Sequence, residues 1–264
     1  MSSNEFNTSD RRKQKIARIH GFEYKIYPNG TIIDFEKLSA SLGNILESKE
    51  LLSKYHPEVL KLSILSNQSE GLKELTEEHY LASEKRLYYF YQTLNKIKTF
   101  ANENSELNEY IAPHGRIIKP EILDGINKSF VAAINDNFNT SLVVSDFLQL
   151  FKYSNALLTN ANENALHKLT TLNKIYKSIL IVANLIGIFM EEPEEFILQM
   201  KEKYIKLNNI DMNEVKELMN LRQDAKLNKN YDLSDEIKSK LDHKGIIVQD
   251  SALGSEWDIK ALFI

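Results

Sequence analysis

The chain has 264 residues, of which 42% are hydrophobic and 27% charged, an ordinary balance for a globular protein with one large or two to three small domains. Its net charge of −4 gives no global basic field of the kind that marks many nucleic-acid-binding proteins, although a local basic face is compatible with it. The absence of cysteine excludes disulfides and thiolate metal sites, the six histidines lack metal-site spacing, and no apolar run indicates a membrane span or a secretory signal, so a cytoplasmic location is expected.

The N-terminal stretch is polar and then basic, with five cations between Arg11 and Arg18. Such a stretch is either an arm that contacts RNA or a solvated, partly disordered terminus, and we favour the second interpretation. Apolar and polar side chains then alternate over residues 22–26, and Asn29-Gly30 suits a tight turn. This pattern predicts a short β-hairpin over residues 20–35.

Residues 45–66 carry an apolar helical pattern that Pro57 divides into two pieces. A long helix is expected to begin after Thr76, a good N-cap residue that is followed by two glutamates. Its expected buried stripe consists of Leu87, Phe90, Tyr91, Leu94 and Ile97. The tyrosines at 88, 89 and 91 fan over more than one helix face, which favours packing over a platform for stacking bases.

Residues 103–118 show no clear period and are expected to form a loop. Helices are then expected after Pro120, after a cap at Asn139 or Thr140, over about 164–190, and from Pro193 onward. The buried positions expected on the third of these helices are Leu172, Ile175, Ile179 and Leu185. Together these helices predict an antiparallel helical bundle.

A mostly polar connector at residues 208–213 indicates a domain boundary. Beyond it, helices are expected at 213–227 and 232–244, with Gly245 as the stop signal of the second. An apolar strand at 246–248, a turn, and a strand around Trp257 follow, with the tryptophan as the core anchor of the hairpin. The pattern predicts two helices packed against a small hairpin.

Four segments carry a resemblance to a known family. The first is Lys37-Leu38-Ser39-Ala40-Ser41-Leu42-Gly43-Asn44 with Tyr55-His56-Pro57-Glu58-Val59-Leu60-Lys61; the others are Asn135 to Thr140, Leu185 to Phe196, and Arg222 to Trp257. Each resembles a motif of the cysteinyl-tRNA synthetases. The first is similar to the family's KMSKSLGN and KY-x-PEVLR strings, the second to DDFNT, and the third to LLGLL…PEAF. The fourth is similar to a helix with the pattern R-x-x-A-(K/R) that is followed by a D-W-x-x-A-D-like string. Their joint order over residues 37–260 identifies the chain as similar to the C-terminal half of this class I aminoacyl-tRNA synthetase family.

The resemblance implies a mainly α fold in four parts. These parts are a basic N-terminal arm and short hairpin (1–36), a KMSKS-like loop with stem-contact-fold helices (37–118), an antiparallel helical bundle of the class I anticodon-binding type (119–207), and a small α+β anticodon-binding-like module (208–264).

The family activates cysteine with ATP and transfers it to tRNA, using a HIGH motif and a zinc ion held partly by cysteine thiolates. This chain has no cysteine and no HIGH string, and in its KMSKS-like loop Ala40 replaces the second lysine, which stabilises departing pyrophosphate in the family. The loop, with Lys37, Ser39, Ala40 and Ser41, is therefore either a vestigial structural relic or a loop that touches nucleotide in another chain's active site. The chain alone is expected to be catalytically inactive and to hold neither of the family's cofactors, ATP and Zn.

In the family, the C-terminal unit reads the anticodon of cysteine tRNA, and the resemblance places its four contact residues at Lys226, Tyr231, Asp235 and Asp250. A tyrosine ring can stack an unpaired base, and aspartates can accept hydrogen bonds from amino groups on base edges. Lys226 keeps the charge of the family's arginine but lacks its bidentate fork. The alternatives are that Asp235 pairs with Lys238 and that Tyr231 packs near a helix cap.

Three functions remain open at this point. The chain is a tRNA-binding subunit or paralogue that works with a separate catalytic chain, with cysteine tRNA favoured; a fragment or trans-complementing part of a cysteine–tRNA ligase; or a degenerate paralogue that acts as a protein-interaction module. Met1 and the complete C-terminal module favour a free-standing chain over a fragment. No membrane partner is expected.

Overall fold

The computed structural model describes residues 15–19, 22–26, 32–37, 48–67, 75–251 and 254–263, the first three ranges by their backbone alone. Within these residues the fold is mainly α, with ten α-helices and a two-stranded sheet near the C-terminal end, as predicted. Lys37 is described only as the last backbone position of a strand. The predictions for Ser39, Ala40 and Ser41 fall outside the described residues.

The N-terminal strands form an antiparallel sheet in the order β1-β2-β3, with β1 at Lys15–Ile19, β2 at Phe22–Ile26 and β3 at Ile32–Lys37. The predicted hairpin is confirmed as β2 and β3. The strand β1, which was not predicted, begins at Lys15 within the basic stretch. Two residues separate β1 from β2, the commonest length of a hairpin loop, so the sequence contained this signal.

The helices around Pro57 follow the predicted division, with α1 at Ser48–Lys54 and α2 at Pro57–Leu65. The long helix α3 spans Glu77–Glu103 behind the predicted N-cap Thr76. Its predicted stripe is buried in full: Leu87, Phe90, Tyr91, Leu94 and Ile97. Tyr88 is buried as well, so Tyr88 and Tyr91 serve packing as predicted, whereas Tyr89 is half-buried.

The prediction of a loop over residues 103–118 is wrong. A 3-10 helix at Ser105–Leu107 leads into α4 at Asn108–His114. Neither helix buries a residue of its own, so no apolar period marks them in the sequence. The segment after α4 is held instead by polar contacts, since the Ile118 N–H donates to Thr171 Oγ1 at 2.9 Å.

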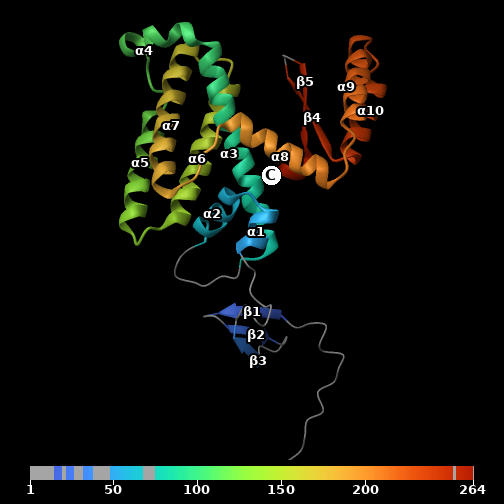
Figure 1. Cartoon of the computed structure of the whole chain (residues 1–264). Helices are drawn as coiled ribbons and strands as arrows, with labels where there is room; N and C mark the ends of the chain where they lie inside the picture. Colours follow the sequence, from blue (N-terminus) through green and yellow to red (C-terminus); the bar gives the residue numbers. More distant parts are fainter. Residues whose placement is uncertain are drawn as a thin grey trace, which may run out of the picture.

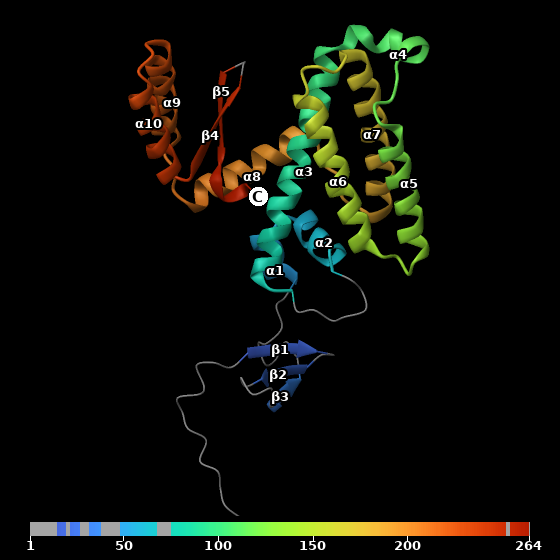
Figure 2. The same ribbon diagram turned by 180° about the vertical axis from the view of Figure 1, so that it is seen from behind.

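The predicted bundle is present as α5 (Pro120–Asn135), α6 (Thr140–Thr159), α7 (Ala165–Ile186) and α8 (Pro193–Leu207). Figures 1 and 2 show α5, α6 and α7 standing beside the upper half of α3, while α8 crosses its middle. The helix α7 ends at residue 186, earlier than the expected 190, because Gly187 adopts a left-handed φ of 71°. Leu185 is 70% exposed, so its predicted burial is wrong.

An aromatic cluster forms the centre of the bundle. The Phe90 and Phe151 rings of α3 and α6 stack with centroids 4.5 Å apart. Phe189, in the segment between α7 and α8, meets both rings edge-on at 5.9 and 5.7 Å. Rings in these arrangements contribute beyond their buried area, so this cluster fixes where α8 begins relative to α3 and α6.

The buried carboxylate of Glu58 joins α2 to the segment between α7 and α8. It accepts hydrogen bonds from the Phe189 N–H at 2.9 Å, the Met190 N–H at 2.7 Å and the Tyr91 hydroxyl at 2.9 Å. Glu58 is 3% exposed, and a charge so buried is tolerated because its oxygens are hydrogen-bonded. The hydrogen bonds therefore explain why a glutamate stands inside the apolar pattern of α2.

Two further contacts bring family-like segments together at α2. Lys61 Nζ donates to the Gly187 carbonyl at 2.9 Å, and Thr140 Oγ1 donates to the Leu65 carbonyl at 2.9 Å. Three of the four segments that carry the resemblance thus meet around one short helix. Their residue types serve the contacts between helices.

The C-terminal module consists of α9 (Met212–Leu227), α10 (Tyr231–His243), β4 (Ile246–Ser251) and β5 (Gly254–Ile259), followed by a 3-10 helix at Lys260–Leu262. The two helices pack together and α10 packs on β4, as predicted (Figure 1). The buried apolar residues of this unit include Val215, Ile237, Leu241, Ile246, Val248 and Ile259.

The module is anchored to the rest of the chain through β5. Asp258 accepts hydrogen bonds from the Tyr88 hydroxyl and from Gln92 Nε2, both at 2.5 Å. Lys201 Nζ of α8 lies 3.6 Å from Asp258 and 4.5 Å from the centroid of the half-buried Trp257 ring. Trp257 packs against the core, which agrees with its predicted role as an anchor. The predicted division into four parts stays a prediction.

Candidate functional site

The four predicted tRNA-contacting residues lie on three elements of the C-terminal module. Lys226 is in the last turn of α9, Tyr231 begins α10, Asp235 follows one turn later, and Asp250 lies near the end of β4. Asn230 caps α10 by accepting a hydrogen bond from the Leu233 N–H at 3.2 Å, which fixes where Tyr231 enters the helix.

A bidentate ion pair lies at the centre of this region. Arg222 Nη1 and Nη2 donate to Asp250 Oδ1 and Oδ2 at 2.8 and 2.7 Å. The Arg222 side chain is 2% exposed and that of Asp250 is 37% exposed. Ser255, opposite Asp250 in the β4–β5 register, donates to Asp250 Oδ1 at 2.6 Å and accepts from Arg222 Nη1 at 3.0 Å. The pair ties α9 to the hairpin.

Lys226 joins the same carboxylate, with Nζ 2.8 Å from Asp250 Oδ1. The Arg222 hydrogen bonds, followed by those of Lys226 and Ser255, hold the pKa of Asp250 well below its usual range. The Asp250 bonds in turn raise the pKa of Arg222 despite its burial, and the nearby charge of Asp235 adds to this. Arg222 and Lys226 therefore share the carboxylate of Asp250.

Sequence reasoning did not select Arg222 as a site residue. The available signal was its position four residues before Lys226, which puts both cations on one face of α9. Charged residues are almost never fully buried unless paired. The burial of Arg222 could therefore not be predicted before its partner, Asp250, was known.

Tyr231 and Asp235 lie at the surface. Tyr231 is 63% exposed, which contradicts the alternative that it packs near the cap. Asp235 is exposed, and the structure shows no ion pair between it and Lys238. Among the described residues neither side chain is held by a hydrogen bond, so both are available to a partner.

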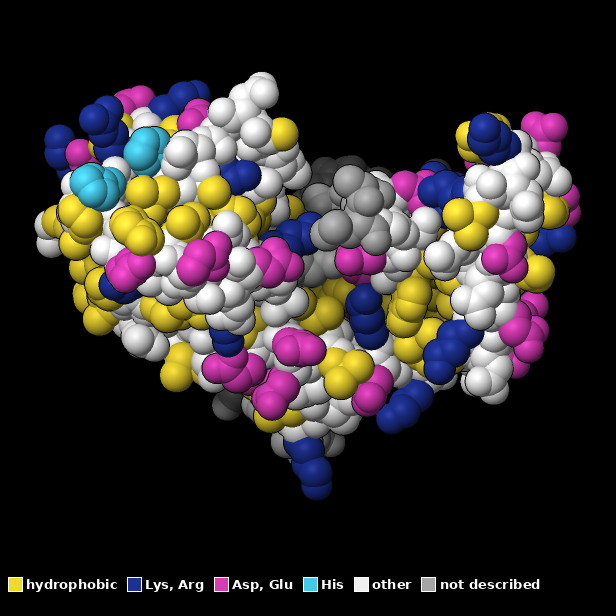
Figure 3. All heavy atoms as spheres, turned by 90° about the horizontal axis from the view of Figure 1, so that it is seen from above, with side chains coloured by type: hydrophobic (Ala, Val, Ile, Leu, Met, Phe, Trp, Pro, Cys, Tyr) yellow, Lys and Arg dark blue, Asp and Glu magenta, His cyan; other side chains and the backbone are white. Residues whose placement is uncertain are grey.

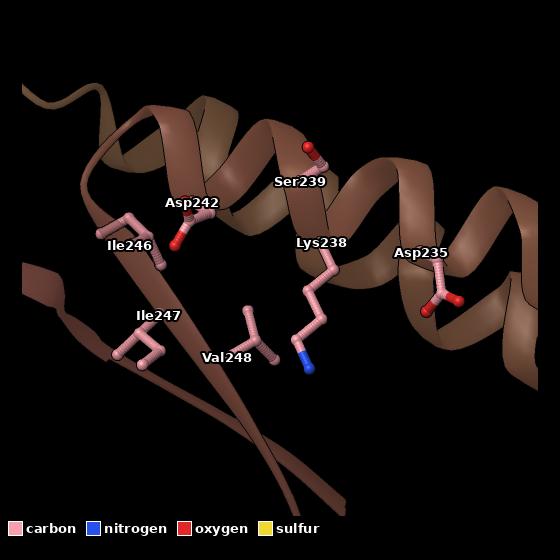
Figure 4. Close-up of a pocket in the computed structure, with 7 residues that line it drawn as sticks. All are labelled: Asp235, Lys238, Ser239, Asp242, Ile246, Ile247 and Val248. Carbon is pink, nitrogen blue, oxygen red and sulfur yellow. The ribbon is translucent and has the colours of Figure 1, made fainter.

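A groove of about 350 Å³ runs between α10 and β4 (Figure 4). Its α10 side carries Asp235, Lys238 and Asp242, and its β4 side carries apolar residues from Ile246 to Val248. Figure 4 shows the Lys238 side chain extending from the helix toward β4, with Asp235 on the same side one turn away. An apolar floor with a polar rim suits a flat group with hydrogen-bonding edges.

Apolar side chains are exposed around the turn between α9 and α10. Leu227 is 74% exposed and Leu233 40% exposed, beside the ring of Tyr231. On the face viewed in Figure 3, Lys and Arg side chains are interspersed with Asp and Glu side chains and form no single basic field. Any nucleic-acid contact at this tip would therefore rely on stacking and base edges more than on net charge.

The part of the chain that the structure describes contains no group of three or more His, Asp or Glu side chains placed to hold a metal ion. It also contains no helix that is both long and apolar enough to cross a bilayer.

The sequence of this chain is similar to those of known proteins. No family model matches the chain. It is 30% identical to the cysteine–tRNA ligase of Desulfotalea psychrophila over 256 residues, which cover 94% of this chain and 51% of that protein. This chain is a homologue of the cysteine–tRNA ligases. The ligase of Methanococcus aeolicus is 30% identical over 237 residues, and the chloroplastic/mitochondrial ligase of Arabidopsis thaliana is 26% identical over 238 residues.

The matches cover most of this chain but only about half of each ligase. The Methanococcus and Arabidopsis matches each cover 89% of this chain but only 47% and 41% of those ligases. The chain therefore spans about half the length of the curated relatives that it matches, which is consistent with their C-terminal half.

Proposed function

We propose that this chain binds tRNA, with cysteine tRNA as the favoured species, through the tip of α9 and α10 and the groove beside β4. The observation that supports this most is the exposure of Tyr231 and Asp235 on α10, where Asp235 lines the groove, in a module that the buried Arg222–Asp250 ion pair holds together. Because the backbone that carries Tyr231 and Asp235 is held in place before binding, less conformational entropy is lost when a ligand binds.

The four residues have different roles in this proposal. Tyr231 stacks an unpaired base, and Asp235 accepts a hydrogen bond from an amino group on a base edge. Asp250 Oδ1 already has three partners, Arg222, Ser255 and Lys226, whereas Oδ2 accepts one hydrogen bond. Asp250 therefore acts mainly as a positioning residue that holds Lys226 toward the site.

A filter-binding titration with cysteine tRNA tests the proposal. Replacing Tyr231 by alanine is expected to weaken binding about tenfold, since stacking of one base on an aromatic ring contributes about 1–3 kcal/mol. Tyr110→Ala on α4 is the matched control, because Tyr110 is also exposed, at 46%, and lies outside the module. Equal affinities for the two variants contradict the proposed role of Tyr231.

Specificity needs a second titration with a non-cognate tRNA. Asp235→Ala is expected to reduce the preference for cysteine tRNA, because a base-edge acceptor discriminates between bases whereas a phosphate contact does not. A folded chain that binds no tRNA would instead favour a protein-interaction module.

The proposal also covers the relation of the chain to catalysis. We propose that these 264 residues do not activate cysteine alone, because they contain no HIGH string and Ala40 replaces the second lysine of the KMSKS-like loop. ATP–pyrophosphate exchange with the isolated chain is expected to be absent. Exchange above background would contradict this part of the proposal and favour an unexpected active site in the chain.

A further inference from the structure

A pocket of about 510 Å³ lies away from the α9–α10 tip, between α3, α6 and the C-terminal 3-10 segment. Its polar lining includes Lys85, Arg86 and Lys152, and its apolar lining includes Tyr89, Leu148 and Phe263. The volume falls within the range of about 300–1,000 Å³ that is typical of small-ligand sites.

Among the residues that the structure describes, this pocket is lined by positive charge alone. Three cationic side chains line it and no acidic side chain does. Lys85 and Lys152 form no ion pair or hydrogen bond within the described residues, and Arg86 reaches only the Ser66 hydroxyl, at 3.4 Å. Positive charge gathered in a concave, partly apolar site attracts anions more strongly than the same charge on an open surface.

One carboxylate, that of Asp258, is bonded to a residue of the pocket lining and already has several partners. Gln92, which lines the pocket, donates to Asp258, and that carboxylate also accepts hydrogen bonds from the Tyr88 hydroxyl and the Ile259 N–H. Lys201 adds a further cation 3.6 Å from it. Asp258 therefore leaves the cations of the pocket available to a ligand.

The apolar wall is held in place. Tyr89 is half-buried, and its hydroxyl accepts a hydrogen bond from Asn155 Nδ2 at 3.0 Å. Leu148 and Phe263 are half-buried beside it. Tyr89 and Leu148 pack against the hydrophobic core, and together with Phe263 they offer an apolar surface for a planar group.

We propose that this pocket binds a nucleotide, with the phosphate near Lys85, Arg86 and Lys152 and the base against Tyr89, Leu148 and Phe263. This site is separate from the α9–α10 tip and does not rest on the function proposed for it. The nucleotide is either free in solution or part of an RNA strand, and the two sources share the chemistry that the pocket recognises.

Equilibrium dialysis of the full chain with 5′-AMP tests the proposal. Adenosine and inorganic phosphate, each carrying half of the recognised chemistry, are expected to bind at least tenfold more weakly than 5′-AMP. Lys85→Ala and Lys152→Ala are each expected to weaken 5′-AMP binding about tenfold, as for the loss of a charge-assisted hydrogen bond. Neither residue has an ion-pair or hydrogen-bond partner in the described part of the chain, so these variants should fold normally.

Two controls separate this proposal from the earlier one. Lys174→Ala removes an exposed lysine of α7 that does not line the pocket, and Tyr231→Ala alters only the α9–α10 tip, so both should leave 5′-AMP binding unchanged. Absence of saturable 5′-AMP binding, or equal binding by the Lys85→Ala/Lys152→Ala double variant, overturns the proposal.

A competition experiment assigns the source. If a short single-stranded RNA displaces 5′-AMP at a lower concentration than unlabelled 5′-AMP does, the pocket serves an RNA strand. If the RNA does not compete while unlabelled 5′-AMP does, the pocket serves a free nucleotide.

Discussion

Replacing Asp250 by alanine would leave the Arg222 guanidinium buried, with Ser255 as its remaining hydrogen-bond partner among the described residues. Arg222 is 2% exposed and cannot turn to water without opening the packing between α9 and the hairpin. Breaking a fully buried ion pair by removing one partner costs about 3–5 kcal/mol, and an exposed pair contributes about 0–1 kcal/mol. Because Asp250 itself is 37% exposed, we expect a loss of about 2–3 kcal/mol in the free energy of unfolding.

Urea unfolding followed by tryptophan fluorescence measures this loss, because Trp257 is the only tryptophan of the chain and lies on β5 of the same module. Asp242→Ala is the matched control. Asp242 pairs with Lys260 at 2.6 Å, but the two side chains are 45% and 52% exposed, so its removal should cost less than about 1 kcal/mol. Equal midpoints for Asp250→Ala and Asp242→Ala would refute the reasoning.

A double variant sharpens the test. Arg222→Met combined with Asp250→Ala removes both charges and leaves none buried. It should therefore be more stable than Asp250→Ala alone, since the cost of the single variant comes mainly from the uncompensated guanidinium.

The pH dependence of the same pair has a definite sign. The pKa of Asp250 is lowered in the folded state below its ordinary value of about 3.9, so the unfolded state binds its proton first as pH falls. The stabilisation by Asp250 is therefore complete above about pH 5 and decreases below about pH 4. The difference in unfolding free energy between the native chain and Asp250→Asn should shrink over that lower range, and a difference that grew on acidification would contradict the sign.

Further predictions concern the helical part of the chain. Glu58→Ala should lower the free energy of unfolding by about 3 kcal/mol, because it removes the acceptor of the buried Phe189 N–H and Tyr91 hydroxyl and of the partly buried Met190 N–H. In the same urea titration Glu50→Ala, at an exposed pair, should change this free energy by less than about 0.5 kcal/mol. Gly115→Ala should cost about 1–3 kcal/mol, because its Cβ would overlap Thr170 Oγ1 and lie 2.6 Å from a backbone oxygen. Gly125→Ala, in the middle of α5 with open space around it, should instead stabilise the fold by about 0.5–1 kcal/mol. A thermal melt in which both glycine variants shift in the same direction would contradict the close approach of Thr170 and Ile111 to Gly115.

Much of the fold followed from local signals in the sequence. The bounds of α9 and α10 differ from the predicted ones by a single residue at their starts or ends, because caps and stops such as Asn230 and Gly245 act on their immediate neighbours. The helix α4 escaped prediction because it buries nothing and has no period to detect. Leu185 was misplaced because it lies six residues after Ile179, about 120° around the helix from the buried stripe, which continues instead through Val182 and Ala183.

The site was less predictable, and for a physical reason. The sequence singled out Asp250 as an acceptor for a base, but its main partner, Arg222, lies 28 residues away and becomes a neighbour only when the hairpin folds back on α9. No local pattern reports that a carboxylate is already engaged. The sequence therefore predicts which residues lie in this region, but not which of their side chains remain free to bind a ligand.

This distinction decides how the proposed function has to be tested. Glu58, Thr140 and Asp250 stand in segments that resemble the ligase family, yet each makes contacts that hold helices or strands together. A loss of tRNA binding in a variant of one of them would follow equally from a damaged fold. Tyr231 and Asp235 are exposed and take no part in those contacts, so their variants separate recognition from stability. If Tyr231→Ala weakens tRNA binding while the urea midpoint stays fixed, the tip of α9 and α10 is a recognition surface; if binding stays unchanged as well, the similarity to the ligases in this module reflects the fold alone.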